Sequence, residues 1–265
     1  MDLAVAASLA VLRRRARQTI LEYSRRELPG FLLELQALGE VGIFGGLLRD
    51  SALAYPSAFE SDVDIVVNTE DEAEFDKFFR SRQGIVNRFG GYRLNLSRGV
   101  VDVWPLRRTW AFRVGLRKGS SLRDLLGTTY FSWDSIVYSW TGQRLYCKDD
   151  YLEGIHRRVV ELELAENPHP LGALVRTMRL VEFGRARVGY RLASHTTWLT
   201  RQFEDKEIID ADRRRLRAPY LNAASVRRLR IQLEQFVETA ANNESFGAPM
   251  HRQLTLPFMR NTGSG

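Results

Sequence analysis

Two aspartates, one residue apart, open an apolar stretch that is typical of a β-strand. Asp62 and Asp64 stand in S-D-V-D-I-V-V. Residues i and i+2 of a strand point to the same face, with Cα atoms about 6.5 Å apart. Carboxylates in an apolar setting are costly unless they have a partner. Hard oxygen ligands suit Mg2+, which often takes one or two carboxylates together with substrate phosphates. The pair therefore predicts a metal site at one edge of a sheet.

A third carboxylate lies in the next apolar stretch, V-V-D-V-W. Asp102 is the acidic residue inside that predicted strand. Three acids at one place repel each other without cations, so Asp62, Asp64 and Asp102 together predict a bound cation. Asp102 is also the candidate that draws the proton from an attacking hydroxyl. The alternative is a chance D-x-D pattern on a solvated loop, and the strand context argues against it.

Two adjacent glycines precede the aspartates, in I-F-G-G-L-L-R-D at 43–50. Gly45 and Gly46 lie between a predicted strand and a predicted helix, where backbone N–H groups can approach phosphate oxygens. Arg49, one turn into that helix, could reach the same phosphates or pair with Asp50. A tight turn without a ligand is the alternative. The chain contains neither G-x-x-x-x-G-K-[ST] nor G-x-G-x-x-G, which excludes the P-loop and the dinucleotide-binding turn.

The pattern around these residues predicts the elements that hold them. Strands are expected at 41–44, 63–67, 92–96, 100–104, 135–140 and 144–147, with helices at 47–54 and 71–80. Residues 2–28 predict a helix that ends at Pro29-Gly30, and 170–240 show helical spacing without a convincing strand. The expected class is α+β, a mixed-sheet head followed by an all-helical part. The expected domains are 1–38, 39–155, 156–240 and a loosely structured tail at 241–265.

Composition narrows the partners and the compartment. The 265 residues carry 39 Lys and Arg against 32 Asp and Glu, a net charge of +7, which favours a polyanionic partner. Arginines at 213–217 and 227–230 could follow an RNA backbone or form a solvated helix face. The single Cys147 excludes an internal disulfide. The apolar run at 3–12 is too short to span a bilayer and precedes its arginines, so we expect a cytoplasmic protein without membrane contact.

Gly-Gly-x-x-Arg-Asp followed by Asp-x-Asp on a strand resembles the polymerase β-type nucleotidyltransferase superfamily. The sequence is most similar to the head domain of class II CCA-adding enzymes and bacterial poly(A) polymerases. The resemblance extends over about residues 40–190. It includes F-S-W-D-S-I-V-Y at 131–138, G-Q-R-L-Y at 142–146 and P-L-G-A-L-V-R-T-M-R-L-V-E-F-G at 170–184, which is similar to the neck helix of that family.

The resemblance implies roles for individual residues. Asp62 and Asp64 would bind two Mg2+ ions, Asp102 would be the third carboxylate, and the two glycines would contact the triphosphate. Arg176 and Arg179 match two of the three neck arginines that read the incoming base. Arg93, in N-R-F-G-G-Y-R, could bind substrate phosphates or be a solvated residue of a bulged strand. The remaining nucleotide-binding candidates are Arg49 and Ser61.

Two departures from the family concern the choice of base. Thr128, Thr129 and Tyr130 stand where the family carries Arg-Arg-Asp, and Ala173 replaces the first neck arginine. A template for a base edge needs donors and acceptors at fixed places. These substitutions therefore predict a nucleotide preference that differs from strict CCA addition.

Three hypotheses about function follow. The first is a Mg2+-dependent nucleotidyltransferase that uses a nucleoside triphosphate such as ATP, releases pyrophosphate and modifies a hydroxyl at a tRNA-like RNA 3′ end. The second is a defence- or toxin-type nucleotidyltransferase that modifies tRNA, a nucleotide, a protein or a small molecule. The third is a catalytically inactive nucleic-acid-binding module, against which the three intact aspartates argue.

Overall fold

The computed structural model describes residues 5–23, 27–53, 62–97, 99–183, 186–214, 220–242 and 253–254. The chain divides into two compact units, Met1–His156 and Arg157–Gly265, and the N-terminal helices belong to the first. Among the described residues, none of the helices is both long and apolar enough to cross a membrane.

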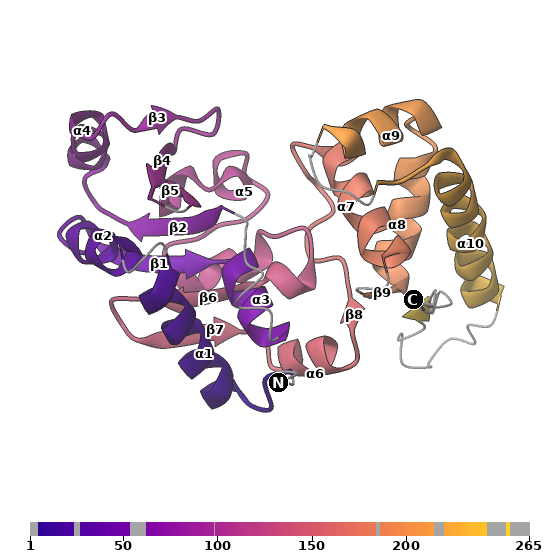
Figure 1. Cartoon of the computed structure of the whole chain (residues 1–265), viewed down its shortest axis with the longest axis horizontal. Coiled ribbons are helices and arrows are strands. Elements are labelled where there is room, and N and C mark those ends of the chain that lie inside the picture. Colours follow the sequence, from indigo (N-terminus) through magenta and orange to yellow (C-terminus); the bar gives the residue numbers. More distant parts are fainter. Residues whose placement is uncertain are drawn as a thin grey trace, which may run out of the picture. The chain divides into compact units, whose positions relative to one another are not determined.

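A seven-stranded mixed sheet forms the centre of the first unit (Figure 1). Its parallel pair is β2 with β5, and the other neighbours are antiparallel. The predicted strands and the α+β class are confirmed. In spatial order the strands are β3 (Ile85–Val86), β4 (Tyr92–Leu96), β5 (Gly99–Pro105), β2 (Val63–Asn68), β1 (Glu40–Phe44), β6 (Ile136–Ser139) and β7 (Arg144–Cys147).

One face of this sheet is covered by the N-terminal helices and by the helix after β2. Those helices are α1 (Leu9–Glu22), α2 (Glu27–Leu35) and α4 (Glu72–Ser81). Tyr92 of β4 stacks on Phe79 of α4, and Phe79 also contacts Phe31 of α2. Helix α4 begins where its sequence predicts, because the Asp71 carboxylate accepts hydrogen bonds from the backbone N–H groups of Ala73 and Glu74.

The predicted end of the first helix is wrong. Pro29 and Gly30 do not terminate a helix but lie in the first turns of α2, which begins at Glu27. A proline near a helix N-terminus lacks only a backbone N–H that would have no intrahelical partner there. The role of Pro29 therefore depends on where the helix begins, and the sequence pattern did not reveal that start.

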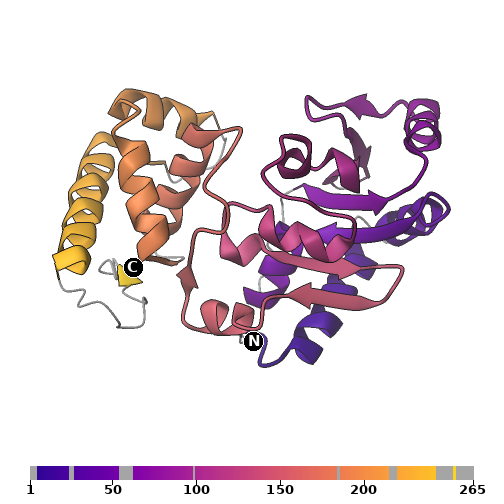
Figure 2. The same cartoon turned by 180° about the vertical axis from the view of Figure 1, so that it is seen from behind.

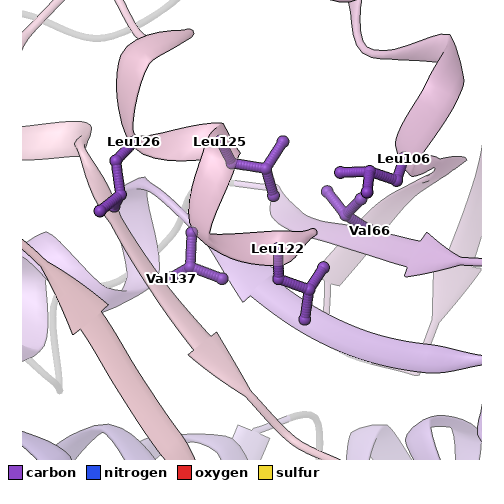
Figure 3. Close-up of a cluster of buried hydrophobic side chains, with 6 residues drawn as sticks. All are labelled: Val66, Leu106, Leu122, Leu125, Leu126 and Val137. Atoms are coloured by element: carbon purple, nitrogen blue, oxygen red, sulfur yellow. The ribbon is translucent and has the colours of Figure 1, made fainter. Parts of the chain in front are cut away.

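The opposite face is covered by the segment that follows β5, and Figure 2 shows the sheet from that side. The segment includes η3 (Leu106–Arg108), α5 (Trp110–Arg113) and η4 (Leu122–Gly127). It buries an apolar cluster against β2 and β6 (Figure 3). The members of this cluster are Val66, Leu106, Leu122, Leu125, Leu126 and Val137. Val66 has the same parity as Asp64 along β2, so the carboxylate lies on this face, beside the cluster.

The described residues of the second unit form mainly four helices. They are α7 (Pro170–Glu182), α8 (Tyr190–Thr200), α9 (Asp205–Arg213) and α10 (Ala223–Asn242). It also contains a small sheet that the sequence did not predict, in which β9 (Arg187–Gly189) pairs with β8 (Val159–Val160) and β10 (Gln253–Leu254). Three-residue strands are too short to show the alternation by which strands are recognised.

Candidate active site

The turn from β1 into α3 (Gly46–Leu53) requires a glycine. Gly45 has φ +72°, in the left-handed region, and its N–H donates to the carbonyl of Ile136 in β6. Its own carbonyl accepts hydrogen bonds from the backbone N–H groups of Leu48 and Arg49, which starts the helix. A Cβ on Gly45 would lie 3.8 Å from Oδ2 of Asp64, at ordinary contact distance. The glycine turn therefore adjoins Asp64, one of the candidate carboxylates.

The register of three strands aligns the acidic residues on one face. Asp64 of β2 lies directly opposite Asp102 of the parallel strand β5 and opposite Phe44 at the end of β1. Paired residues of neighbouring strands share a face, so both carboxylates project to the same side. Asp62 stands two residues before Asp64, just ahead of β2. The carboxylates that the sequence singled out thus come together at one end of the central strands.

Arg93 joins two of these carboxylates. It lies opposite Asp102 in the β4–β5 register, and its Nε and Nη2 donate to the two oxygens of Asp102 at 3.0 and 2.6 Å. The same Nη2 donates to Oδ2 of Asp62 at 2.6 Å. The hydrogen bond to Asp102 is the main cause that raises the pKa of Arg93, and attraction to Asp62 and Asp64 adds to it. The site therefore already holds one positive charge, the guanidinium of Arg93.

The donor set suits a hard divalent cation, but the three acids do not form a ligand cluster as they stand. Oδ2 of Asp62 and Oδ2 of Asp102 each lie 2.6 Å from one nitrogen, so both could contact a single small cation at that position. Across the described ranges, no group of three or more His, Cys, Asp or Glu side chains is arranged to hold a metal ion. The guanidinium of Arg93 lies between the two carboxylates that such a cation would bridge.

Arg49 is paired with two other carboxylates, those of Asp50 and Asp134. Its Nε donates to Asp50 at 2.8 Å and its Nη1 to Asp134 at 2.6 Å. Burial lowers the pKa of this guanidinium, but attraction to Asp134 and Asp50 outweighs burial, and the net shift is upward. Asp134 ends η5 (Ser132–Asp134), so the pair ties α3 to the segment before β6. Sequence reasoning missed Asp134, although it is the one acid within the aromatic stretch at 130–138.

The neck candidates lie on α7 in the second unit. Arg176 is exposed, whereas Nη1 of Arg179 donates at 2.8 Å to Asp212, a side chain that is fully buried. The other oxygen of Asp212 accepts the backbone N–H of Leu221. Arg179 therefore has a structural contact that the sequence did not predict. Ala173 is buried within the same helix.

Thr128, Thr129 and Tyr130 contact residues close to them in the sequence. The Thr128 hydroxyl donates to the carbonyl of Leu125, and the Thr129 hydroxyl donates to that of Phe131. Tyr130 is buried and packs edge-on against Phe131. None of these three side chains offers a carboxylate or a guanidinium. Ser61 lies outside the described residues.

Several arginines of the predicted RNA-binding clusters are exposed, and others are committed to contacts. Arg213, Arg214 and Arg227 are exposed. Arg228 donates to both oxygens of Glu182, and Arg230 donates to Asp205 and to backbone carbonyls. Arg215 and Arg217 fall among the residues that the structure does not describe.

Comparison with known proteins identifies the fold. No protein-family profile matches the sequence, and no curated protein matches it significantly. The structure is similar to a CCA-adding enzyme solved with CTP (TM-score 0.56, 15% identity, 89% of this chain and 57% of that chain). It is also similar to the Thermotoga maritima CCA-adding enzyme complexed with tRNA (TM-score 0.54, 15% identity, 88% and 57%).

A tRNA nucleotidyltransferase with a primer tRNA and an incoming ATP analog matches as well (TM-score 0.50, 16% identity, 80% of this chain and 66% of that chain). The resemblance to the head and neck of class II CCA-adding enzymes is thereby confirmed as a likeness of fold. This chain spans about half to two thirds of the length of these structures.

Proposed function

We propose that this protein is a Mg2+-dependent nucleotidyltransferase that transfers a nucleoside monophosphate from a triphosphate to the 3′ hydroxyl of an RNA. The observation that carries the proposal is the register in which Asp64 lies opposite Asp102, with Asp62 two residues away and the Gly45 turn adjoining. Carboxylates that converge next to a glycine turn at a helix N-terminus suit a substrate that brings both phosphates and cations.

The chain's own residues supply positioning and proton transfer. The backbone N–H of Gly46 at the start of α3 would face the triphosphate, with the positive end of the helix dipole behind it. The N–H of Gly45, which the sequence also predicted to face phosphate, donates instead to the carbonyl of Ile136. Asp62, Asp64 and Asp102 would hold Mg2+, which neutralises phosphate charge when bound. Asp102 would take the proton from the attacking hydroxyl. The hydroxyl oxygen forms a bond to the α-phosphorus, the bond to the β-phosphate oxygen breaks, and pyrophosphate leaves.

An RNA acceptor is supported by charge and by the similar structures. Two of those structures contain tRNA, and the exposed arginines Arg213, Arg214 and Arg227 suit a phosphate backbone. The contacts of Thr128 and Thr129 and the burial of Tyr130 support a base preference other than strict CCA addition, because these side chains present no charged group to a base edge.

The test is a labelled-triphosphate panel. The protein is incubated with Mg2+, total RNA and each of the four α-labelled nucleoside triphosphates in turn. We expect label in RNA from at least one triphosphate. The double variant Asp62→Asn/Asp64→Asn keeps the side-chain shape and removes both charges, so it should lose at least about a thousandfold in rate, as expected for lost electrostatic stabilisation of a transition state.

The matched control is Asp149→Asn, an exposed aspartate of the same unit. It should label RNA as well as the wild type does. Equal labelling by the double variant and the wild type would refute the metal site, whereas absence of label in any acceptor with the wild type would refute transfer altogether.

A second candidate differs in its acceptor. Thr128, Thr129, Tyr130 and Ala173 stand at the base-template positions. These substitutions favour a defence- or toxin-type transferase that uses the same site on tRNA, a nucleotide, a protein or a small molecule. Label that appears in protein or in a small molecule, with RNA unlabelled, would establish this alternative.

A further inference from the structure

The guanidinium of Arg93 occupies the position that the proposed reaction requires for a divalent cation. A single nitrogen, Nη2, lies 2.6 Å from a carboxylate oxygen of Asp62 and 2.6 Å from one of Asp102. Nε contacts the second oxygen of Asp102 at 3.0 Å, which makes the pair bidentate. Charge-assisted bidentate pairs are the stronger ion pairs of proteins. A divalent cation that bridges the same two oxygens, Oδ2 of Asp62 and Oδ2 of Asp102, would have to take the position that Nη2 of Arg93 occupies.

The pairing of β4 with β5 holds Arg93 beside Asp102. Arg93 and Asp102 are directly paired in the antiparallel β4–β5 ladder, so their side chains share a face at a short separation. The contact is built into the backbone register and does not depend on a flexible loop. The side chain of Arg93 is nevertheless 46% exposed, against 16% for Asp102. An arginine with that exposure can leave the carboxylates without disturbing the buried core.

We propose that Arg93 competes with the divalent cation for Asp62 and Asp102, and that it is released to the triphosphate when cation and nucleotide arrive together. This inference rests on the proposed function of the same site. In the nucleotide-free protein the guanidinium neutralises part of the carboxylate charge and weakens cation binding. When a cation–triphosphate complex enters, the carboxylates exchange one positive partner for another, and Arg93 gains the phosphate oxygens that its planar fork suits.

The consequence is thermodynamic coupling between the two ligands. A cation that enters alone must displace Arg93 into water, whereas one that enters with a triphosphate leaves the arginine with a new anionic partner. Coupling of this kind is reciprocal, so the nucleotide must tighten cation binding by the same factor by which the cation tightens nucleotide binding. Because the pair is partly solvated, we expect about a fivefold to tenfold effect.

The test measures Mn2+ binding, by the electron paramagnetic resonance signal of free Mn2+, with and without a non-hydrolysable triphosphate analogue. Arg93→Gln removes the charge and keeps a polar side chain. In the absence of nucleotide it should bind Mn2+ about fivefold to tenfold more tightly than the wild type. The tightening caused by the analogue should be clear in the wild type and nearly absent in the variant.

Arg82→Gln is the matched control, because Arg82 also pairs with one carboxylate, Glu34 at 2.7 Å, in an exposed setting of the same unit. Its Mn2+ affinity and coupling should equal those of the wild type. Arg93→Lys is the second variant if Arg93→Gln does not fold, as judged by circular dichroism. Lysine cannot make the bidentate contact, so Mn2+ binding should still tighten, by at least about twofold.

The results separate this inference from the proposed function. If the wild type labels RNA but removal of Arg93 leaves Mn2+ binding unchanged or weaker, the competition is refuted and the transferase stands. If the wild type labels no acceptor with any triphosphate, the proposed function fails whatever the Mn2+ titration gives. Tighter Mn2+ binding in Arg93→Gln together with lost coupling supports the inference.

Discussion

Gly45 is the position where a single methyl group tests the local geometry of the candidate site. Its φ of +72° belongs to the left-handed region, which costs a residue with a Cβ about 1–2 kcal/mol. An added Cβ would lie 3.8 Å from Oδ2 of Asp64 and 3.9 Å from the carbonyl of Asp134, so it meets no steric clash. Alanine also restricts the unfolded chain, which returns about 0.4–1 kcal/mol. Gly45→Ala should therefore destabilise the protein by about 1 kcal/mol.

Urea unfolding followed by circular dichroism measures this loss, and the RNA-labelling assay measures its effect on the site. The matched control is Gly30→Ala in α2. Apart from its chain neighbours and the backbone of its own helix, no atom of the described residues lies within 4 Å of its added Cβ. Alanine is also the better helix former, so this variant should gain about 0.5–1 kcal/mol. Gly45→Asn should lose less than Gly45→Ala, because asparagine tolerates the left-handed region.

The pair of glycine variants makes the reasoning refutable. If Gly45→Ala were as stable as Gly30→Ala, the left-handed turn would not be present in solution. A loss above about 3 kcal/mol would contradict the absence of a steric clash, since conformational strain alone does not reach that magnitude. Either result would remove the geometric basis for a phosphate-facing turn.

Three further predictions concern other parts of the chain. Asp212→Ala should destabilise the second unit by about 3 kcal/mol in thermal unfolding, because it removes the fully buried carboxylate that pairs with Arg179. The hydrogen bond from Arg108 lowers the pKa of Asp76. The ionised carboxylate therefore stabilises the fold above its unfolded pKa, and this contribution is lost as the pH falls through its folded pKa. In Asp76→Asn the free energy of unfolding should depend less on pH below about pH 4. Burial raises the pKa of Cys147 to about 11 from an ordinary 9.0, so alkylation by iodoacetamide at pH 8 should be about a hundredfold slower than for the urea-unfolded chain.

Each of these predictions has a control or an outcome that contradicts it. Glu234→Ala removes the carboxylate of an exposed 3.6 Å pair with Arg201 and should cost under about 1 kcal/mol; a similar loss in Asp212→Ala would refute the buried pair. If the free energy of unfolding of Asp76→Asn fell with pH in parallel with that of the wild type, the pKa of Asp76 would not differ between the folded and unfolded states. Equal alkylation rates in folded and unfolded protein would show that the fold neither covers the Cys147 thiol nor raises its pKa.

Six of the seven strands of the first unit were predictable because each is a short run with apolar or aromatic residues bounded by turn residues, whereas β3, only two residues long, was not predicted. Their alternation also placed Asp62 and Asp64 on one face, since side-chain direction along a strand depends only on residue parity. The α+β class followed from strands concentrated in the first half and helical spacing in the second. The fold of the CCA-adding enzymes was indicated by motifs that are weak singly and specific together.

The predictions failed where the outcome depended on distant contacts or on very short elements. Pro29 lies within the first turn of α2 and does not end a helix. The strand β9 exists because it pairs with β8 and β10, which are shorter still. In neither case does the local sequence carry the information, because a helix start and a strand partner are defined by hydrogen bonds to other residues.

The sequence by itself determined which residue types are available for chemistry: three aspartates in or beside apolar strands, a glycine pair and arginines nearby. The tertiary structure alone decided which of them meet. The β4–β5 register brings Arg93 onto Asp62 and Asp102, and the segment before β6 brings Asp134 to Arg49 across 85 residues. Parity along one strand is a local property, whereas the pairing of strands is set by loop lengths and by burial of the whole sheet. The sequence therefore indicated the carboxylates, and only the folded sheet revealed the arginine between them.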